Sequence, residues 1–185
     1  LSGLDLRHHI AEQRLTLPLV RMDKTEIEVS AAFRPIPDAQ TPLITVVLHD
    51  ITARKRYEEQ LVYMANHDAL TNLPNRRKFE QRLGNLLKTV EGTRNTHLII
   101  LDIDSFSEIN SRWGHQAGDI VLCELAHLLQ ESIRSHDFVA RYKGSRFAML
   151  LTETNVDSAL LVIDRIRSQF EAKPTRWEED TEIHH

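Results

Sequence analysis

Two apolar runs separated by four polar residues predict an antiparallel hairpin in the second half of the chain. The runs cover residues 138–142 and 147–151, and so short a connection joins only antiparallel neighbours. The turn between them consists of Lys143, Gly144, Ser145 and Arg146. It therefore carries two cations and no carboxylate, although the segment LDIDSF upstream is acidic.

The composition is that of an ordinary globular protein. The 185 residues are 41% hydrophobic and 27% charged, which suits one or two domains with a buried core. A net charge of −4 gives no overall attraction to nucleic acid. The longest apolar runs are far shorter than the ~20 residues of a membrane-spanning helix. We therefore expect no membrane segment in this stretch. The one cysteine, Cys123, is expected to be a buried, inert thiol. Because there is no signal-peptide pattern, we expect a cytoplasmic location.

The first part of the chain, residues 1–52, is rich in β-formers. Runs at residues 15–22, 27–33 and 43–49 are separated by turn residues and by a proline-bounded loop, which predicts a three-stranded meander. A unit of about 50 residues buries a small fraction of its surface. We therefore expect this segment to be the end of a larger domain.

A helix is predicted next, at residues 53–66, with Asp50 or Thr52 as its N-cap. Tyr57, Leu61 and Met64 recur along it at spacings of four and three. Such a seam can pack against its copy in a second chain as a short coiled coil. The alternative is that it packs on a neighbouring domain.

From residue 67 the pattern alternates between helices and strands. A helix with one face formed by Phe79, Leu83, Leu86 and Val90 is predicted after Pro74. The further predicted elements are a buried strand at 97–103, a short helix at 105–113, a break at 114–118, a long helix at 119–135, the hairpin, and a helix at 156–171. The polar residues 174–185 are expected to form a loop or tail.

Carboxylates at the end of the predicted strand suggest a ligand site. Asp102 would face a crevice, and Asp104 would cap the following helix if that helix begins there. Asn110 and Asp119 are residue types that read a purine edge, because an amide donates and accepts while a carboxylate accepts two hydrogen bonds. The structural alternatives are a helix-end role for Asn110 and an N-cap role for Asp119.

Four separated blocks, HDALTNLPNRRKF, LDIDSFSEINSRWGHQAGD, LCELAHLL and RSHDFVARYKGSRFAMLL, resemble the GGDEF domain, the fold of diguanylate cyclases. Ahead of them, LITVVLHDITARKRYEEQL resembles the end of a PAS sensor domain and its signalling helix. The resemblance implies an α+β, nucleotidyl-cyclase-like fold with a mainly antiparallel central sheet flanked by helices. The expected division is a PAS-like part at 1–52, a signalling helix at 53–66, a degenerate GGDEF domain at 67–173 and a tail at 174–185.

The resemblance also implies roles for individual positions. Asp102 and the carbonyl of Ile103 would help to hold magnesium ions, and Asn110 and Asp119 would bind guanine. The signature Gly-Gly-Asp/Glu-Glu-Phe aligns with Lys143, Gly144, Ser145, Arg146 and Phe147. Its second and fifth positions match.

The three positions that depart from this signature change the charge and the bulk of the turn. Ser145 replaces a metal-binding acid, and Arg146 adds a cation that repels a divalent ion. Lys143 adds bulk where the family has glycine. From the sequence we therefore expect no productive magnesium binding, no cofactor and no cyclase activity.

A further family pattern, R-x-x-D, occurs at Arg134 and Asp137. In the family it marks an inhibitory site, and the two side chains suit the bacterial second messenger cyclic di-GMP because arginine binds phosphate or guanine bidentately. The structural alternative is an arginine placed at a helix C-terminus.

Three functional hypotheses follow. The first, favoured on the sequence, is a catalytically inactive regulatory module that relays a PAS signal to a phosphodiesterase-like output domain or a partner protein, as a homodimer formed through the signalling helix. The second is a cyclic di-GMP receptor using Arg134 and Asp137. The third is a GTP-binding allosteric module in which Lys143 and Arg146 replace metal charge; an active diguanylate cyclase is the remaining alternative.

Overall fold

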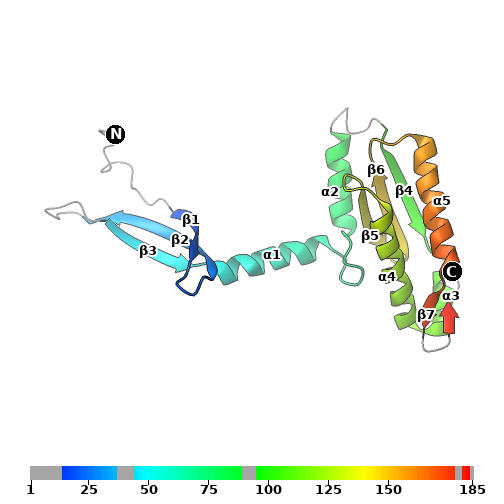
Figure 1. Cartoon of the computed structure of the whole chain (residues 1–185), viewed down its shortest axis with the longest axis horizontal. Coiled ribbons are helices and arrows are strands. Elements are labelled where there is room, and N and C mark those ends of the chain that lie inside the picture. Colours follow the sequence, from blue (N-terminus) through cyan, green and yellow to red (C-terminus); the bar gives the residue numbers. More distant parts are fainter. Residues whose placement is uncertain (1–13, 37–43, 89–94, 178–180, 184–185) are drawn as a thin grey trace. The chain divides into compact units, whose positions relative to one another are not determined.

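The structure, a computed structural model, describes residues 14–36, 44–88, 95–177 and 181–183 (Figure 1). The chain divides into two units, Leu1–Val62 and Tyr63–His185, with the boundary inside a helix. Part of the predicted proline-bounded loop and Val90 lie outside the described residues. Each unit is described by itself.

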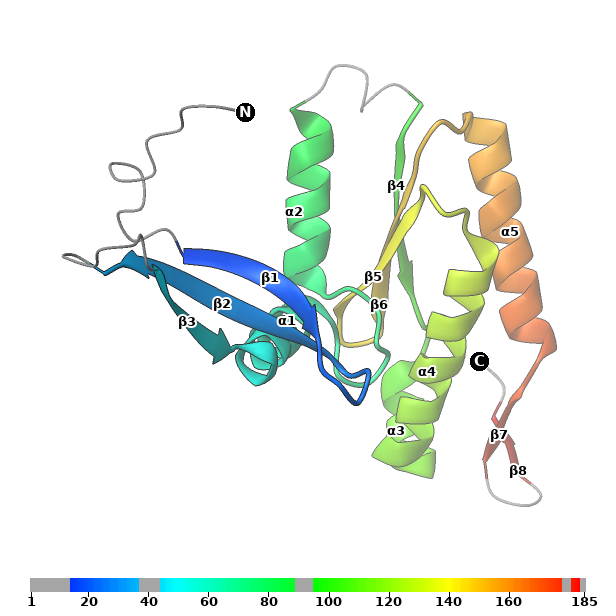
Figure 2. The same cartoon turned by 60° about the vertical axis from the view of Figure 1, so that its left-hand side comes forward.

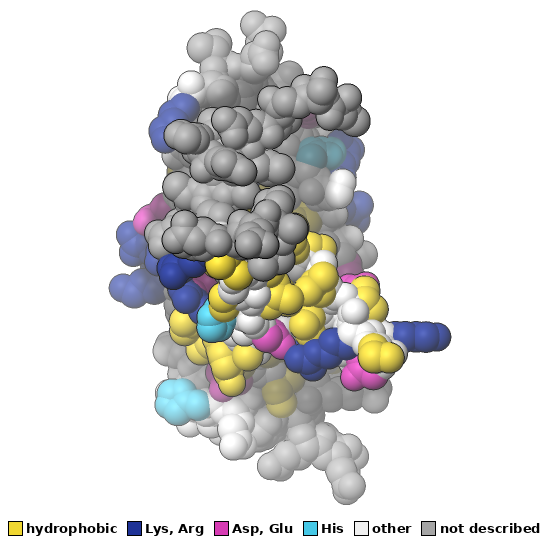
Figure 3. Space-filling model, turned by 90° about the vertical axis from the view of Figure 1, so that its left-hand side faces the viewer, with side chains coloured by type: hydrophobic (Ala, Val, Ile, Leu, Met, Phe, Trp, Pro, Cys, Tyr) yellow, Lys and Arg dark blue, Asp and Glu magenta, His cyan; other side chains and the backbone are white. Residues whose placement is uncertain are grey.

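The first unit contains the predicted meander. Strands β1 (Arg14–Val20), β2 (Glu26–Pro35) and β3 (Ile44–Asp50) pair antiparallel with β2 in the middle. Among its described residues, Val29 and Ala31 are buried. Hydrophobic side chains are visible at the surface in Figure 3, and the exposed ones of the meander include Leu15, Leu17, Leu19, Val46 and Leu48. The described part of the meander therefore has a very small core of its own.

Helix α1 (Thr52–Asn66) follows β3 as predicted. Of the two candidate caps, Asp50 accepts a hydrogen bond from the backbone N–H of Thr52 at 2.9 Å. The Thr52 hydroxyl instead accepts from the N–H of Glu28 on β2. The predicted seam is open, since Tyr57, Leu61 and Met64 are 67, 66 and 72% exposed. Within the described residues, no helix combines the length and apolar character needed to cross a bilayer.

The second unit is built on an antiparallel sheet with strand order β4-β6-β5. The strands are β4 (His97–Asp102), β5 (Phe138–Lys143) and β6 (Arg146–Leu151). Helices α4 (His115–Ser132) and α5 (Val156–Ala172) lie on one face, and α2 (Arg76–Leu87) lies on the other (Figure 2). This arrangement confirms the predicted α+β fold.

Alternating side chains of the sheet supply the two cores of this unit. Phe147 and Met149 of β6 pack with the buried face of α4, whereas Ala148 and Leu150 pack with Phe79 of α2. Because successive residues of a strand point to opposite faces, one strand serves both cores. Strand β6 of the predicted hairpin is thus the central strand of the described sheet.

The prediction of a fully buried strand at 97–103 is wrong for one of its faces. Leu98 and Ile100 are 52 and 53% exposed, whereas Ile99 and Leu101 pack against the larger core. The reason is position: β4 is at the edge of the described sheet, and the contacts of α2 are made with β5.

Two predicted helix boundaries also need correction. Helix α3 (Phe106–Trp113) has Ser105, at φ +52°, in the N-cap position, so Asp104 is not its cap. Helix α4 begins at His115, four residues earlier than predicted, because Gly114 at φ +85° makes the whole break between the helices. Asp119 therefore lies inside α4 and is not its N-cap.

The predicted loop or tail at 174–185 is wrong as well. Strands β7 (Thr175–Trp177) and β8 (Thr181–Ile183) form a hairpin beside α4. The paired residues Thr175 and Ile183 are 0 and 2% exposed, and the Thr175 hydroxyl is hydrogen-bonded to Glu124. A strand of three residues flanked by polar residues is too short for the alternation of apolar and polar residues to be recognised in the sequence.

Candidate functional site

The residues Lys143–Phe147, which we call the signature turn, close directly onto Asp102 at the end of β4. Asp102 lies opposite Arg146 in the β4–β6 register. The Ser145 hydroxyl donates to one oxygen of its carboxylate at 2.5 Å, and Nε of Arg146 donates to the other at 2.9 Å. The two residues that replace the family's acids therefore hold the acid that remains.

These contacts favour the ionised form of Asp102. The hydrogen bond from Ser145 is the largest cause and lowers the pKa of this carboxyl. Burial opposes it, and the hydrogen bond and charge of Arg146 lower the pKa further, so that the net shift is downward. The ion pair is solvent-exposed, with side-chain exposures of 61% for Arg146 and 44% for Asp102. It can therefore exchange partners with a charged ligand at modest cost.

The residues at the signature turn do not fit a site for two magnesium ions. Magnesium prefers several oxygen ligands in octahedral geometry, whereas the turn itself has no carboxylate and the neighbouring Asp102 of β4 already accepts with both oxygens from Ser145 and Arg146. In the described part of the chain, no three His, Cys, Asp or Glu side chains are grouped so that they could hold a metal ion. The expectation that magnesium does not bind productively stays a prediction.

The structure brings the two predicted guanine-binding residues to one place, where α3 packs on α4. A Cβ atom added to Gly118 would lie 2.1 Å from Oδ1 of Asn110, so the Asn110 amide rests against the Gly118 backbone. Asp119 is the next residue along α4 and is exposed. Asn110 thus contacts the residue that precedes Asp119 in the first turns of α4.

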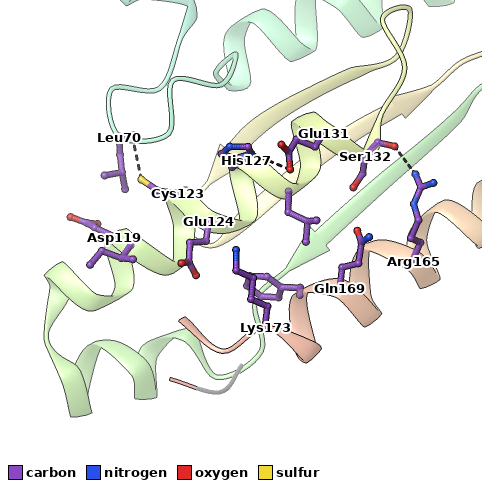
Figure 4. Close-up of a pocket in the computed structure, with 13 residues that line it drawn as sticks. Leu70, Asp119, Cys123, Glu124, His127, Glu131, Ser132, Arg165, Gln169 and Lys173 are labelled. Atoms are coloured by element: carbon purple, nitrogen blue, oxygen red, sulfur yellow. Dashed lines mark hydrogen bonds and ion pairs between the residues drawn. The ribbon is translucent and has the colours of Figure 1, made fainter. Parts of the chain in front are cut away.

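A pocket of about 980 Å³ lies between α4 and α5 and has Asp119 at one end (Figure 4). Leu70 and Cys123 lie at the same end, where the Cys123 thiol is 3.5 Å from the carbonyl oxygen of Leu70. Burial raises the pKa of the thiol, and the charge of Asp119 adds to the effect. Cys123 is half-buried where the sequence predicted a buried residue, and no pattern indicated that Leu70 would border Asp119.

The R-x-x-D residues occupy the connection between α4 and β5. The carboxylate of Asp137 accepts hydrogen bonds from the backbone N–H groups of Arg134 and Thr152, both at 3.0 Å, and its side chain is 5% exposed. Arg134 is exposed. Asp137 therefore ties this connection to the end of β6, and the assignment of the pair to a cyclic di-GMP site stays a prediction.

Replacing Asp137 with alanine should destabilise the domain by about 1–3 kcal/mol, because two backbone donors would lose their acceptor. Urea unfolding followed by circular dichroism would measure the change. Arg134→Ala is the matched control, since an exposed side chain of the same loop should leave the unfolding midpoint nearly unchanged. Equal midpoints for the two variants would contradict the structural role of Asp137.

Comparison with protein families identifies residues 65–185 as "Diguanylate cyclase, GGDEF domain". The probable diguanylate cyclase DgcE of Escherichia coli K12 is 42% identical over 134 residues, which cover 72% of this chain and 12% of that protein. Diguanylate cyclase DgcM of the same strain is 40% identical over 134 residues, covering 72% of this chain and 33% of that protein. The chain thus spans a third or less of these two relatives.

A solved structure of the coiled coil and GGDEF domain of DgcB from Caulobacter crescentus, in complex with c-di-GMP, has the same fold. The TM-score is 0.67 at 30% identity, and the match covers 72% of this chain and 70% of that one. The family match at residues 65–185 includes the sheet and the helices around the signature turn.

The prediction that this chain is not an enzyme is contradicted by these findings, because proteins 40 and 42% identical to it are named diguanylate cyclases. The prediction gave decisive weight to the five residues of one turn, whereas the likeness extends over 134 residues. A changed turn is a variation within an enzyme family and does not place the chain outside it. The chain belongs to the GGDEF family of diguanylate cyclase domains.

Proposed function

We propose that this chain contains the GTP-binding domain of a diguanylate cyclase. The observation that carries the proposal is the contact of Asn110 with Gly118, the residue that precedes Asp119 on α4. The names of the relatives support the same activity. The ion pair of Asp102 with Arg146 at the end of β4 also supports the proposal, because it is a charged, exposed group at which a charged ligand could bind.

Guanine is the base that this pair of side chains recognises. The Asp119 carboxylate can accept from the ring N–H and the amino group of guanine, and the Asn110 amide can donate to an acceptor on the same base. Adenine lacks this pattern of donors, so it would leave polar groups unpaired. Sites of this kind discriminate strongly between bases because an unpaired polar group is costly.

The signature turn supplies positive charge for the triphosphate. Lys143 and Arg146 are both exposed, and Arg146 uses Nε for Asp102, which leaves other guanidinium N–H donors for phosphate oxygens. Arginine binds phosphate bidentately and lysine binds it as a point charge. We therefore propose that part of the affinity for GTP does not depend on magnesium.

Titration calorimetry with GTP and with ATP, each with and without magnesium, tests this function, and chromatography of the same samples measures cyclic di-GMP. We expect GTP to bind at least about tenfold more tightly than ATP, because each lost base contact is worth about 1.4 kcal/mol or more. Asn110→Ala should bring the two affinities close together. Equal affinities for GTP and ATP in the unaltered protein would overturn the proposal.

The meander and α1 are proposed to form the end of a PAS-like sensor domain and its signalling helix, which pass a signal to this domain and from it to an output domain or partner. The open seam on α1 supports a homodimer. Its three large side chains would be covered in a parallel pair of helices.

Leu61→Glu should weaken self-association about tenfold or more, because a carboxylate in the middle of the seam would lose its hydration on pairing. Sedimentation velocity over a concentration series would measure the effect. Glu59→Lys changes a charge on the opposite side of the same helix and is the control. If both variants associate as the unaltered chain does, the seam is not the dimer contact.

A further inference from the structure

Arg141 on β5 joins the signature turn to a segment more than 70 residues earlier in the chain. Its Nε donates to the carbonyl oxygen of Gly144 at 3.0 Å, and its Nη1 donates to the Asp68 carboxylate at 2.9 Å. The side chain of Arg141 is 15% exposed, and that of Asp68 is 26% exposed. One half-buried guanidinium therefore contacts both the turn and the loop that follows α1.

Asp68 is itself held in a closed loop. Its Oδ1 atom accepts from the backbone N–H of Thr71 at 2.9 Å and from the Thr71 hydroxyl at 2.8 Å. Burial opposes its ionisation, but the hydrogen bonds from Thr71 and Arg141 outweigh that effect and lower the pKa of the carboxyl. The backbone N–H of Arg141 also donates to the Pro74 carbonyl at 3.0 Å, so loop and strand are joined twice.

The same loop, residues 67–75, also contacts the last turn of α1. The Tyr63 ring stacks on His67 with centroids 3.9 Å apart, and its hydroxyl donates to Oδ1 of Asn72 at 2.7 Å. Asn75 donates from its side chain to the Ala65 carbonyl at 3.0 Å. The end of α1, the loop and Arg141 thus form a continuous series of contacts within the second unit.

The contacts continue from Arg141 into the candidate site. Gly144, whose carbonyl Arg141 holds, is in the left-handed region at φ +58°, and a register shift in the β5–β6 ladder lies between Arg141 and Lys143. Ser145 and Arg146 follow directly and bind Asp102. A displaced Gly144 carbonyl would therefore move both donors away from that carboxylate.

We propose that Arg141 is a positioning residue that sets the signature turn according to the position of the last turn of α1, with Asp68 as the link between them. This inference rests on the proposed function in one respect, namely that the turn binds GTP. If the two ends are coupled in this way, a change at one end alters the other.

Hydrogen–deuterium exchange of the full chain without nucleotide provides that test. Asp68→Asn, Arg141→Gln and Tyr63→Phe should each accelerate exchange at residues 143–147 by about threefold or more, while β4 and the rest of β6 keep their protection. Asp164→Asn, which alters an exposed carboxylate paired with Arg167 on α5, is the matched control and should change nothing at the turn.

The inference is overturned if the turn keeps its protection in any of the three variants, or if exchange rises equally across the whole sheet, which would indicate a loss of general stability. GTP affinity is then measured on the same proteins, and Asp68→Asn should weaken it about threefold or more. If the unaltered chain fails to bind GTP, the proposed function fails, whereas the exchange result still decides whether α1 and the turn are coupled.

Discussion

Replacing Ser145 and Arg146 with glutamate and Lys143 with glycine should raise magnesium-dependent formation of cyclic di-GMP by about 10²–10³-fold. That factor is what one preorganised electrostatic group commonly contributes to a catalysed rate. The triple variant would add two carboxylates beside Asp102, remove the cation that now pairs with it, and take away bulk at the turn. Chromatography of products formed from GTP by equal amounts of folded protein would measure the change.

A second variant separates the loss of the ion pair from the gain of acids. Ser145→Ala with Arg146→Ala removes both donors to Asp102 but adds no carboxylate, so we expect product formation at saturating GTP to show none of the rise of the triple variant. An equal rise in both variants would mean that Arg146 inhibits by occupying Asp102. No rise in the triple variant, at equal stability, would show that the turn does not limit this domain.

The elements with a strong local signal were predictable from the sequence. The β5–β6 hairpin was placed within one residue at each end because two apolar runs and a four-residue turn admit one pairing. Helix α2 followed from its apolar face and from the turn before it, where Asn75 accepts from the N–H of Lys78. Local chemistry decides such elements, and tertiary packing does not overturn it.

Contacts between distant segments were not predictable in the same way. The pairing of Asp68 with Arg141 joins two residues that no periodicity relates. The start of α4 was missed because Gly114 alone makes the break, although a second glycine at 118 suggested a longer one. Gly118 is instead the place where α3 approaches α4, and this close approach depends on the fold and not on local preference.

The limits of sequence reasoning at the site have the same origin. Asp102, Ser145 and Arg146 were each singled out, but their mutual hydrogen bonds follow from the β4–β6 register. The mistaken conclusion about enzymatic class came from treating the turn in isolation. Asp102 and the two residues predicted to bind guanine, Asn110 and Asp119, remain in the fold around it, and the relatives are named diguanylate cyclases.

Gly118→Ala should weaken GTP binding about tenfold or more while leaving the domain folded. A Cβ atom there would lie 2.1 Å from Oδ1 of Asn110 and 3.1 Å from Cζ of Phe106, so both side chains have to move. The loss of one well-placed hydrogen bond to the base accounts for a factor of this size. Alanine is also the better helix former by about 1 kcal/mol, which offsets part of the cost of the displacement.

Gly84→Ala on α2 is the matched control, because nothing lies within 4 Å of its added Cβ atom. It should stabilise its helix by up to about 1 kcal/mol without changing the affinity for GTP, and thermal unfolding with calorimetry would measure both quantities.

A double-mutant cycle then identifies the cause. In an Asn110→Ala background, Gly118→Ala should cost almost no further affinity, because the amide that it displaces is already absent. Additive losses would mean that Gly118→Ala acts through another part of the site and that Asn110 does not contact the base.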